Sequence, residues 1–310
     1  MRKVAISMGV VLSSVLIAPP VVGQQEQVPA NIQKMAVTFA AVETFLQQNR
    51  LDITDNPKEA FMNGYILVMG EGLPSPTART PSQKRLTAER AATVQAYRAL
   101  AEMLDGVAVV GDTVVKDMAL QYDVVRAAVA GFVRGAQVVY KHWDEKDEVA
   151  VVLVKVGMDG PQGFASLMYQ QFLGNQSIKN QTVKEVPQMK ARPVPVAENF
   201  DGLIVDATGL NFRPALMNRI FNTKGEAVYD PSKISMQVLN EFGCGEYTDS
   251  VEKARDVLAK RGVKNPLVVK ATGTLSLTDL VLSDEDAIRV FSANQKSGFL
   301  NSAKVAFVLK

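Results

Sequence analysis

Few side chains in this sequence could do acid–base, nucleophilic or metal chemistry, and they lie far apart. His142 is the only histidine and Cys244 the only cysteine. Metal centres and nucleophilic relays need several such groups close together, so the sequence predicts no catalytic residue and no metal site. We expect a structural or surface role for His142. Cys244, between Gly243 and Gly245, is expected to be a small buried side chain, with an intermolecular disulfide as the alternative.

Gly70 and Gly72 have the spacing of the first half of a dinucleotide-binding loop. The third glycine of that motif is missing, and the helical pattern begins some ten residues later instead of at the loop. We interpret the pair as the exit of a strand. Walker-type phosphate loops and nucleophile elbows are also missing from the sequence, so no cofactor is expected.

The carboxylates are the remaining candidates for chemistry. Residues 144–148 form a charged turn, and residues 284–286 are explained by the start of a helix. Asp206 ends an apolar strand, where a buried carboxylate would need Arg213 or backbone donors as its partner. The sequence therefore predicts a buried ion pair between Asp206 and Arg213. Calcium-loop spacing is missing from the acidic runs, and no enzyme is predicted.

The amino terminus has the pattern of a secretory signal peptide. Arg2 and Lys3 precede an apolar run over residues 4–18, and two prolines and small residues follow. We predict a signal peptide over residues 1–23 and a periplasmic mature chain without a transmembrane span. An uncleaved anchor is the alternative, although the run is shorter than the ~20 residues that cross a bilayer.

Composition limits the classes of partner and the number of domains. The 310 residues include 34 basic and 32 acidic side chains, and without Arg2 and Lys3 the two charges balance. No basic patch of the kind that binds phosphates is visible, so no nucleic-acid partner is expected. At 47% hydrophobic residues, a chain of this length can bury a sizeable core, and roughly two domains are expected.

The fold class predicted from periodicity is α+β, with two α+β domains whose helices pack on mixed or antiparallel sheets. Residues 24–56 hold an amphipathic helix, which packs on its own domain or is offered to a neighbouring subunit. Residues 57–173 form the first domain. Its expected elements are a strand at 65–69, a helix at 83–104, a strand at 107–115, a helix at 118–130, a hairpin of 136–143 with 149–156, and a helix at 160–173.

The second domain is predicted over residues 200–310, after a polar, proline-containing linker at 174–199. Ser283 with Asp286 resembles a capping box, and a final strand would tie down the chain end. Its expected elements are strands at 202–207, 217–221, 226–229, 267–274, 279–282 and 303–309, and helices at 234–242, 251–260 and after Ser283.

The succession from Gly70 to Met158 resembles the Lpp-twenty lipoprotein family, whose relatives include flagellar protein P and the amino-terminal domain of flagellar assembly protein T. The stretch from Gly202 to Ala207 with Arg213 more loosely resembles the carboxyl-terminal region that accompanies this family. Lipidated members carry a cysteine at the cleavage site, which this chain lacks, so it resembles a non-lipidated variant. The residues that match the family, mostly in structural roles, are Arg90, Tyr97, Glu102, Gly106, Thr113, Gly131, Arg134 and Gly135.

The resemblance implies an exported envelope protein with a structural or assembly role, associated with the flagellum or, through partners, with the outer membrane. The partners it implies are further copies of the chain or envelope and motility proteins. The alternative is a periplasmic binding module for peptidoglycan or a small ligand, with its site in the cleft between the two domains. A polar pocket there would favour binding, whereas exposed apolar faces would favour assembly.

Overall fold

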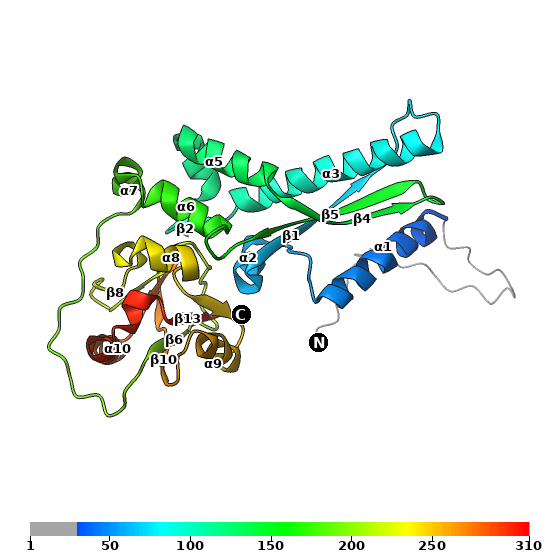
Figure 1. Ribbon diagram of the computed structural model, residues 1–310. Coiled ribbons are helices and arrows are strands. Elements are labelled where there is room, and N and C mark those ends of the chain that lie inside the picture. Colours follow the sequence, from blue (N-terminus) through cyan, green and yellow to red (C-terminus); the bar gives the residue numbers. More distant parts are fainter. Residues whose placement is uncertain (1–29, 310) are drawn as a thin grey trace, which may run out of the picture.

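The computed structural model describes the backbone of residues 30–309 and the side chains from residue 40 onward (Figure 1). The signal peptide predicted over residues 1–23 lies outside this part. Helices and strands alternate through two sheet systems, which confirms the α+β class. In order, the first system contains α1 (Ala30–Asn49), α2 (Pro57–Asn63), β1 (Tyr65–Gly72), α3 (Pro81–Asp105), β2 (Ala108–Val110), β3 (Thr113–Val114), α4 (Val115–Gln121), α5 (Asp123–Arg134), β4 (Gln137–Asp144), β5 (Val149–Gly157), α6 (Phe164–Phe172) and α7 (Gln176–Thr182).

A three-stranded antiparallel sheet in the order β1-β5-β4 is the frame of this first system. The predicted hairpin over residues 136–156 is confirmed as β4 and β5. Together with α3, the two strands extend away from the rest of the molecule as a long arm (Figure 1). The sheet has one open side at β4 and one at β1.

The helix α3 lies directly on β1 because both surfaces are made of small residues. Ala88, Ala92 and Ala96 are fully buried along one stripe of the helix. A Cβ atom at Gly70 would lie 2.2 Å from the Ala92 carbonyl oxygen, and one at Gly72 would lie 2.2 Å from that of Ala88. Only glycine permits this approach. Gly70 and Gly72 therefore belong to strand β1, and their lack of a side chain is needed for the packing of α3 on this strand.

The opposite face of the sheet is covered by the second half of α1. Val42 is buried there, and the Phe45 ring stacks on Tyr140 of β4 with centroids 4.5 Å apart. In the described half, the amphipathic helix therefore packs on its own domain. The apolar residues expected before residue 40 lie outside the described side chains.

Two predicted elements divide into pairs. The strand expected at 107–115 turns back at Gly111, whose φ of 60° is left-handed, and becomes the hairpin β2–β3. The helix expected at 118–130 breaks at Tyr122, whose φ of −128° and ψ of 112° are extended. α4 and α5 result. Neither break could be predicted from the sequence, because the regular spacing of apolar residues continues across both.

The segment expected to be a linker contains α7 and an irregular stretch over residues 184–199, here called the strap, which is hydrogen-bonded to the second half. The Asn175 side chain caps α7 by accepting from the Ser177 backbone N–H at 3.1 Å, and Ile178 is buried. Further along, the Met189 N–H donates to the Ala227 carbonyl oxygen at 2.9 Å. Only one side chain of α7 is buried, so the helix has no periodic signal in the sequence.

The second half is built on a four-stranded sheet in the order β10-β6-β13-β9, in which all pairings are parallel. The last strand, β13, is central, which confirms the expectation that the chain end is tied down. α9 covers one face through Ala254 and Leu258, which pack on Ile204 and Ala306. These elements are β6 (Gly202–Asp206), β9 (Glu246–Thr248), α9 (Val251–Lys260), β10 (Pro266–Lys270) and β13 (Val305–Val308).

A second four-stranded sheet, in the order β11-β12-β7-β8, completes this half. The predicted hairpin around residues 222–225 is confirmed, with Gly225 at a φ of 76°. Ser283 caps α10 by accepting from the Asp286 N–H at 3.1 Å, as expected. The remaining elements are β7 (Arg219–Phe221), β8 (Ala227–Tyr229), the 3-10 helix η1 (Pro231–Lys233), α8 (Met236–Phe242), β11 (Gly273–Ser276), β12 (Asp279–Val281), α10 (Asp284–Ser297) and the 3-10 helix η2 (Phe299–Ser302).

Candidate functional site

The two most reactive side-chain types in the sequence, His142 and Cys244, lie in different environments. His142 is on β4, its ring parallel to that of Tyr140 with centroids 6.4 Å apart. Cys244 is 2% exposed, as expected for a buried side chain, and this burial raises the pKa of its thiol. Among the described residues, no three His, Cys, Asp or Glu side chains are grouped so as to hold a metal ion.

The residues predicted to match the Lpp-twenty family are spread along the first half and do not converge on one site. Tyr97 ties α3 to the start of β4, because its hydroxyl donates to the Ala136 carbonyl oxygen at 3.1 Å. Gly106 and Gly135 follow the ends of α3 and α5 with right-handed backbone angles. Gly131 lies inside α5, where a Cβ atom would meet only the end of the Arg134 side chain, at 3.9 Å. The others are exposed or half-buried: Arg90, Glu102, Thr113 and Arg134.

The ion pair predicted between Asp206 and Arg213 is wrong: it does not form in the described structure. Asp206 Oδ1 turns back along the chain and accepts from the Thr208 N–H at 2.9 Å. The Arg213 N–H donates to the Leu277 carbonyl oxygen at 2.7 Å, which holds this residue beside the β11–β12 turn. The strand end is therefore satisfied locally, without the arginine.

A buried ion pair does exist, between Arg219 of β7 and Asp279 of β12. The guanidinium donates from Nε to Oδ1 at 3.0 Å and from Nη2 to Oδ2 at 2.7 Å. The two side chains are only 10% and 3% exposed. Because β7 and β12 are parallel neighbours with these residues in register, the pair links two strands that are far apart in sequence. Sequence reasoning missed it since strand pairing was unknown.

Buried tyrosines join the two halves of the molecule. Tyr169 of α6 donates its hydroxyl to the Leu216 carbonyl oxygen at 2.6 Å. Phe61 of α2 packs edge-on against Tyr247 of β9, with ring centroids 5.3 Å apart. The Leu216 N–H donates to the carbonyl oxygen of Ala108 in β2 at 2.9 Å. We call this boundary the seam.

Asn218 is the polar centre of the seam. Its side chain is fully buried and accepts from the Ala215 N–H at 2.8 Å, while Nδ2 donates to the Thr278 carbonyl oxygen at 2.7 Å. Tyr247 donates to the Ala215 carbonyl oxygen at 2.8 Å, with Cys244 Sγ 3.2 Å from its hydroxyl. An asparagine inside the apolar run 215–221 is the sequence signal that could have pointed to this centre.

The seam is neutral and closed. Burial raises the pKa values of Tyr169, Tyr229 and Tyr247 well above that of a free tyrosine, so their hydroxyls stay protonated donors. A protonated thiol and three tyrosines offer no activated nucleophile. The apolar residues of both halves form one continuous core through this boundary. The residues of the seam therefore hold the two halves together.

Charged groups border the seam on one side. The Arg261 guanidinium lies over the Phe242 ring at 4.3 Å and contacts Glu246 Oε1 at 3.3 Å. Asp159, after β5, approaches from the first half. The residue keeps exposed surface, but protein surrounds its carboxylate, and this burial, with repulsion from Glu246, raises the pKa of Asp159 to about 6.

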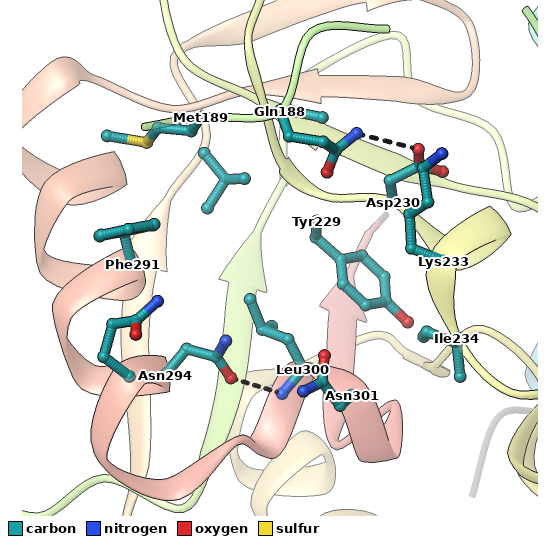
Figure 2. Close-up of a pocket in the computed structure, with 13 residues that line it drawn as sticks. Gln188, Met189, Tyr229, Asp230, Lys233, Ile234, Phe291, Asn294, Leu300 and Asn301 are labelled. Carbon is teal, nitrogen blue, oxygen red and sulfur yellow. Dashed lines mark hydrogen bonds between the residues drawn. The ribbon is translucent and has the colours of Figure 1, made fainter. Parts of the chain in front are cut away.

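A small pocket lies between the strap and α10 (Figure 2). Its volume is about 170 Å³, below the roughly 300 Å³ of ordinary ligand sites. Gln188 Nε2 donates to Asp230 Oδ2 at 3.2 Å on one side, and Asn294 Oδ1 accepts from the Leu300 N–H at 2.9 Å on the other. These polar groups already bond to protein. The pocket therefore fits a few waters better than a ligand.

A larger groove of about 890 Å³ lies at the base of the first sheet, where β4 begins and β5 ends. Apolar and polar side chains share its walls, with glycine backbone between them. Lys155 Nζ lies over the Tyr65 ring, 4.7 Å from the centroid. Other lining residues are Phe132, Gln137, Val139, Asp159 and Gln162. We call this the basal groove.

The comparisons with known proteins concern the second half. Residues 202–310 match a family model described as Treponema pallidum Tp0624, second domain. The matched region covers β6 to β13, and it begins two residues after the predicted start of the second domain. It does not reach the Gly70–Met158 stretch, for which the sequence predicts a relationship to the Lpp-twenty family. No curated protein matches the chain.

In the described residues, no helix is both long and apolar enough to cross a membrane. The match and the geometry together assign no reaction and no ligand to the protein.

Proposed function

We propose that this chain is an exported, non-enzymatic protein of the cell envelope that assembles with further copies of itself or with envelope and motility proteins. The closed seam is the observation that carries the proposal. A hinged binding protein needs an open cleft between its domains, whereas here Asn218 and Tyr247 fill that position. A two-part body with a shared apolar core and a protruding arm suits a structural subunit.

The proposal includes a relationship to the Lpp-twenty family in a non-lipidated form, with the flagellum- or outer-membrane-associated location that this relationship implies. Its support is the resemblance over Gly70 to Met158 and the lack of a cysteine near the predicted cleavage site. The similarity of residues 202–310 to the second domain of Treponema pallidum Tp0624 concerns the second half alone and is independent of this relationship.

A periplasmic binding module for peptidoglycan or a small ligand is the second candidate, and the basal groove favours it. Its volume of about 890 Å³ lies within the usual range for ligand sites. Thermal unfolding of the purified chain with and without soluble peptidoglycan fragments tests this candidate. A midpoint raised by the fragments, and lost with Lys155→Ala, would favour binding over assembly.

Export and assembly are tested together in the cell. The chain is expressed with its own amino terminus, the cells are fractionated, and the intact mass of the purified protein is determined. We expect a new amino terminus at Gln24, a periplasmic or envelope fraction, and a native complex larger than one chain. An uncleaved, cytoplasmic monomer would contradict the proposal.

A further inference from the structure

The basal groove contains two opposite charges that do not pair with each other. Lys155 lies near the end of β5 and Asp159 in the loop that follows, and both line the groove. Within the described chain, neither side chain makes an ion pair. Each charge is therefore available to a group that comes from outside the chain.

Asp159 is held at the wall of the groove without a partner. A Cβ atom at Gly64, another lining residue, would lie 3.1 Å from Asp159 Oδ2. The cation that faces this carboxylate, Arg261, is already paired with Glu246 at 3.3 Å, and no described residue donates a hydrogen bond to it. Surrounding a carboxylate with protein and leaving it unpaired is costly. Carboxylates in this state that line a cleft are typical of binding sites.

Lys155 is also held in a fixed position. Its Nζ lies over the Tyr65 ring, 4.7 Å from the centroid, and the Tyr65 hydroxyl is itself held because it accepts from the Asp52 N–H at 3.0 Å. A cation–π contact uses the face of the ring and leaves the N–H groups of the ammonium free to donate. A carboxylate of a ligand would accept from such an ammonium in a strong, charge-assisted bond.

The spacing of the two charges limits the length of a ligand. Asp159 follows Lys155 by four positions, so the two Cα atoms lie at most about 13 Å apart, at about 3.3 Å per residue. An extended peptide of about two to four residues spans such a distance between its charged ends. The groove, of about 890 Å³, has room for it. Gln137 and Gln162 also line the groove, and their side chains make no hydrogen bond with described residues.

We propose that the basal groove binds a short peptide, of about two to four residues, that carries both a free ammonium group and a free carboxylate. The ammonium lies at Asp159 and the carboxylate at Lys155. This inference rests on the binding candidate for the basal groove, to which it gives a ligand class, and it is independent of the assembly role. Free peptides and the stem peptides of peptidoglycan both carry these groups, so the tests include both sources.

Blocking each end of a probe peptide tests the two contacts separately. Trialanine is titrated into the mature chain by calorimetry at about pH 7, where its amino group is largely protonated. It is compared with N-acetyl-trialanine, which lacks the ammonium, and with trialanine amide, which lacks the carboxylate. We expect trialanine to bind, and either block to weaken binding about tenfold, because one charge-assisted bond is lost. Equal affinity for the three peptides, or no binding of trialanine, would overturn the proposal.

Substitutions in the groove test which residue contacts which end. Asp159→Asn should bind trialanine and N-acetyl-trialanine equally while it still prefers trialanine to the amide, and Lys155→Met should show the reverse pattern. The matched controls Asp256→Asn on α9 and Lys116→Met on α4, both exposed and outside the groove, should keep both preferences. Thermal melts confirm that each variant is folded. Groove variants that keep both preferences, or that lose all three peptides alike, would overturn the assignment of the two ends.

Soluble peptidoglycan fragments separate failure of this inference from failure of the binding candidate. Fragments that raise the unfolding midpoint of the unmodified chain, but not that of Asp159→Asn or Lys155→Met, would support the proposal with peptidoglycan as the source. Binding of trialanine without any effect of the fragments would support it with free peptides as the source. Fragments that stabilise all variants equally would overturn the ligand class and leave the binding candidate in place. No effect of either probe would overturn both, while light scattering tests assembly independently.

Discussion

At the scale of single residues, the buried Arg219–Asp279 pair is the most consequential charged contact. Its two hydrogen bonds and near-complete burial mean that removing one partner leaves an uncompensated charge inside the protein. We expect Asp279→Asn to lower the free energy of unfolding by about 3–5 kcal/mol, measured by urea unfolding. The control is Asp256→Asn, an exposed carboxylate in the middle of α9, which should change stability little. Equal losses of unfolding free energy in the two variants would show that the buried pair stabilises the fold no more than an exposed carboxylate does.

Asp159 gives the seam a pH dependence with a defined sign. Its pKa is raised from 3.8 to about 6, so between these values the folded chain holds a proton that the unfolded chain has released. Stability therefore falls as pH rises through this window, and the loss is complete above about pH 6. Glu246 and Arg261 face the same carboxylate with opposite effects.

The variant Asp159→Asn removes this penalty. Its unfolding midpoint should equal that of the unmodified chain near pH 4, exceed it increasingly up to about pH 6 and stay higher by a constant amount above that, as followed by thermal melts at several pH values. A difference that is constant from pH 4 to pH 8 would mean that Asp159 is not the group responsible.

At the scale of elements, the contact between α3 and β1 depends on glycine. A methyl group at Gly70 would overlap the Ala92 carbonyl oxygen and the Ala96 nitrogen, at 2.2 and 2.4 Å. Because these are backbone atoms, the helix must shift, and Gly70→Ala should cost about 3 kcal/mol. Gly131→Ala is the control, since α5 has room there. We expect that variant to gain about 0.5–1 kcal/mol. Unfolding in guanidinium distinguishes the two.

Helices and strands with a regular spacing of apolar residues could be predicted from the sequence. The elements against which they pack could not. The alanine stripe of α3, the valine hairpin of β4 and β5, and the Ser283 cap were all visible in the sequence. Breaks at Gly111 and Tyr122 were hidden because the apolar spacing continues across them. The parallel order around β13 and the Asn218 centre depend on contacts between distant segments, which no local pattern encodes. The same cause explains the wrong Asp206–Arg213 pair.

At the scale of the whole molecule, the two halves share one apolar core. Phe61 and Tyr169 of the first half contact Tyr247 and Leu216 of the second. Since neither half can lose its structure without exposing this boundary, we expect a single cooperative transition in calorimetry, with equal calorimetric and van't Hoff enthalpies. Two resolved transitions would show that the halves unfold independently and that the seam is weak.

The central claim is that a two-part body with a closed seam acts by assembling. The most direct test is the mass in solution of the mature chain from Gln24 onward, by light scattering over a concentration series. The account predicts a mass that rises from one chain to at least two as concentration increases. A mass of one chain at every concentration would contradict it.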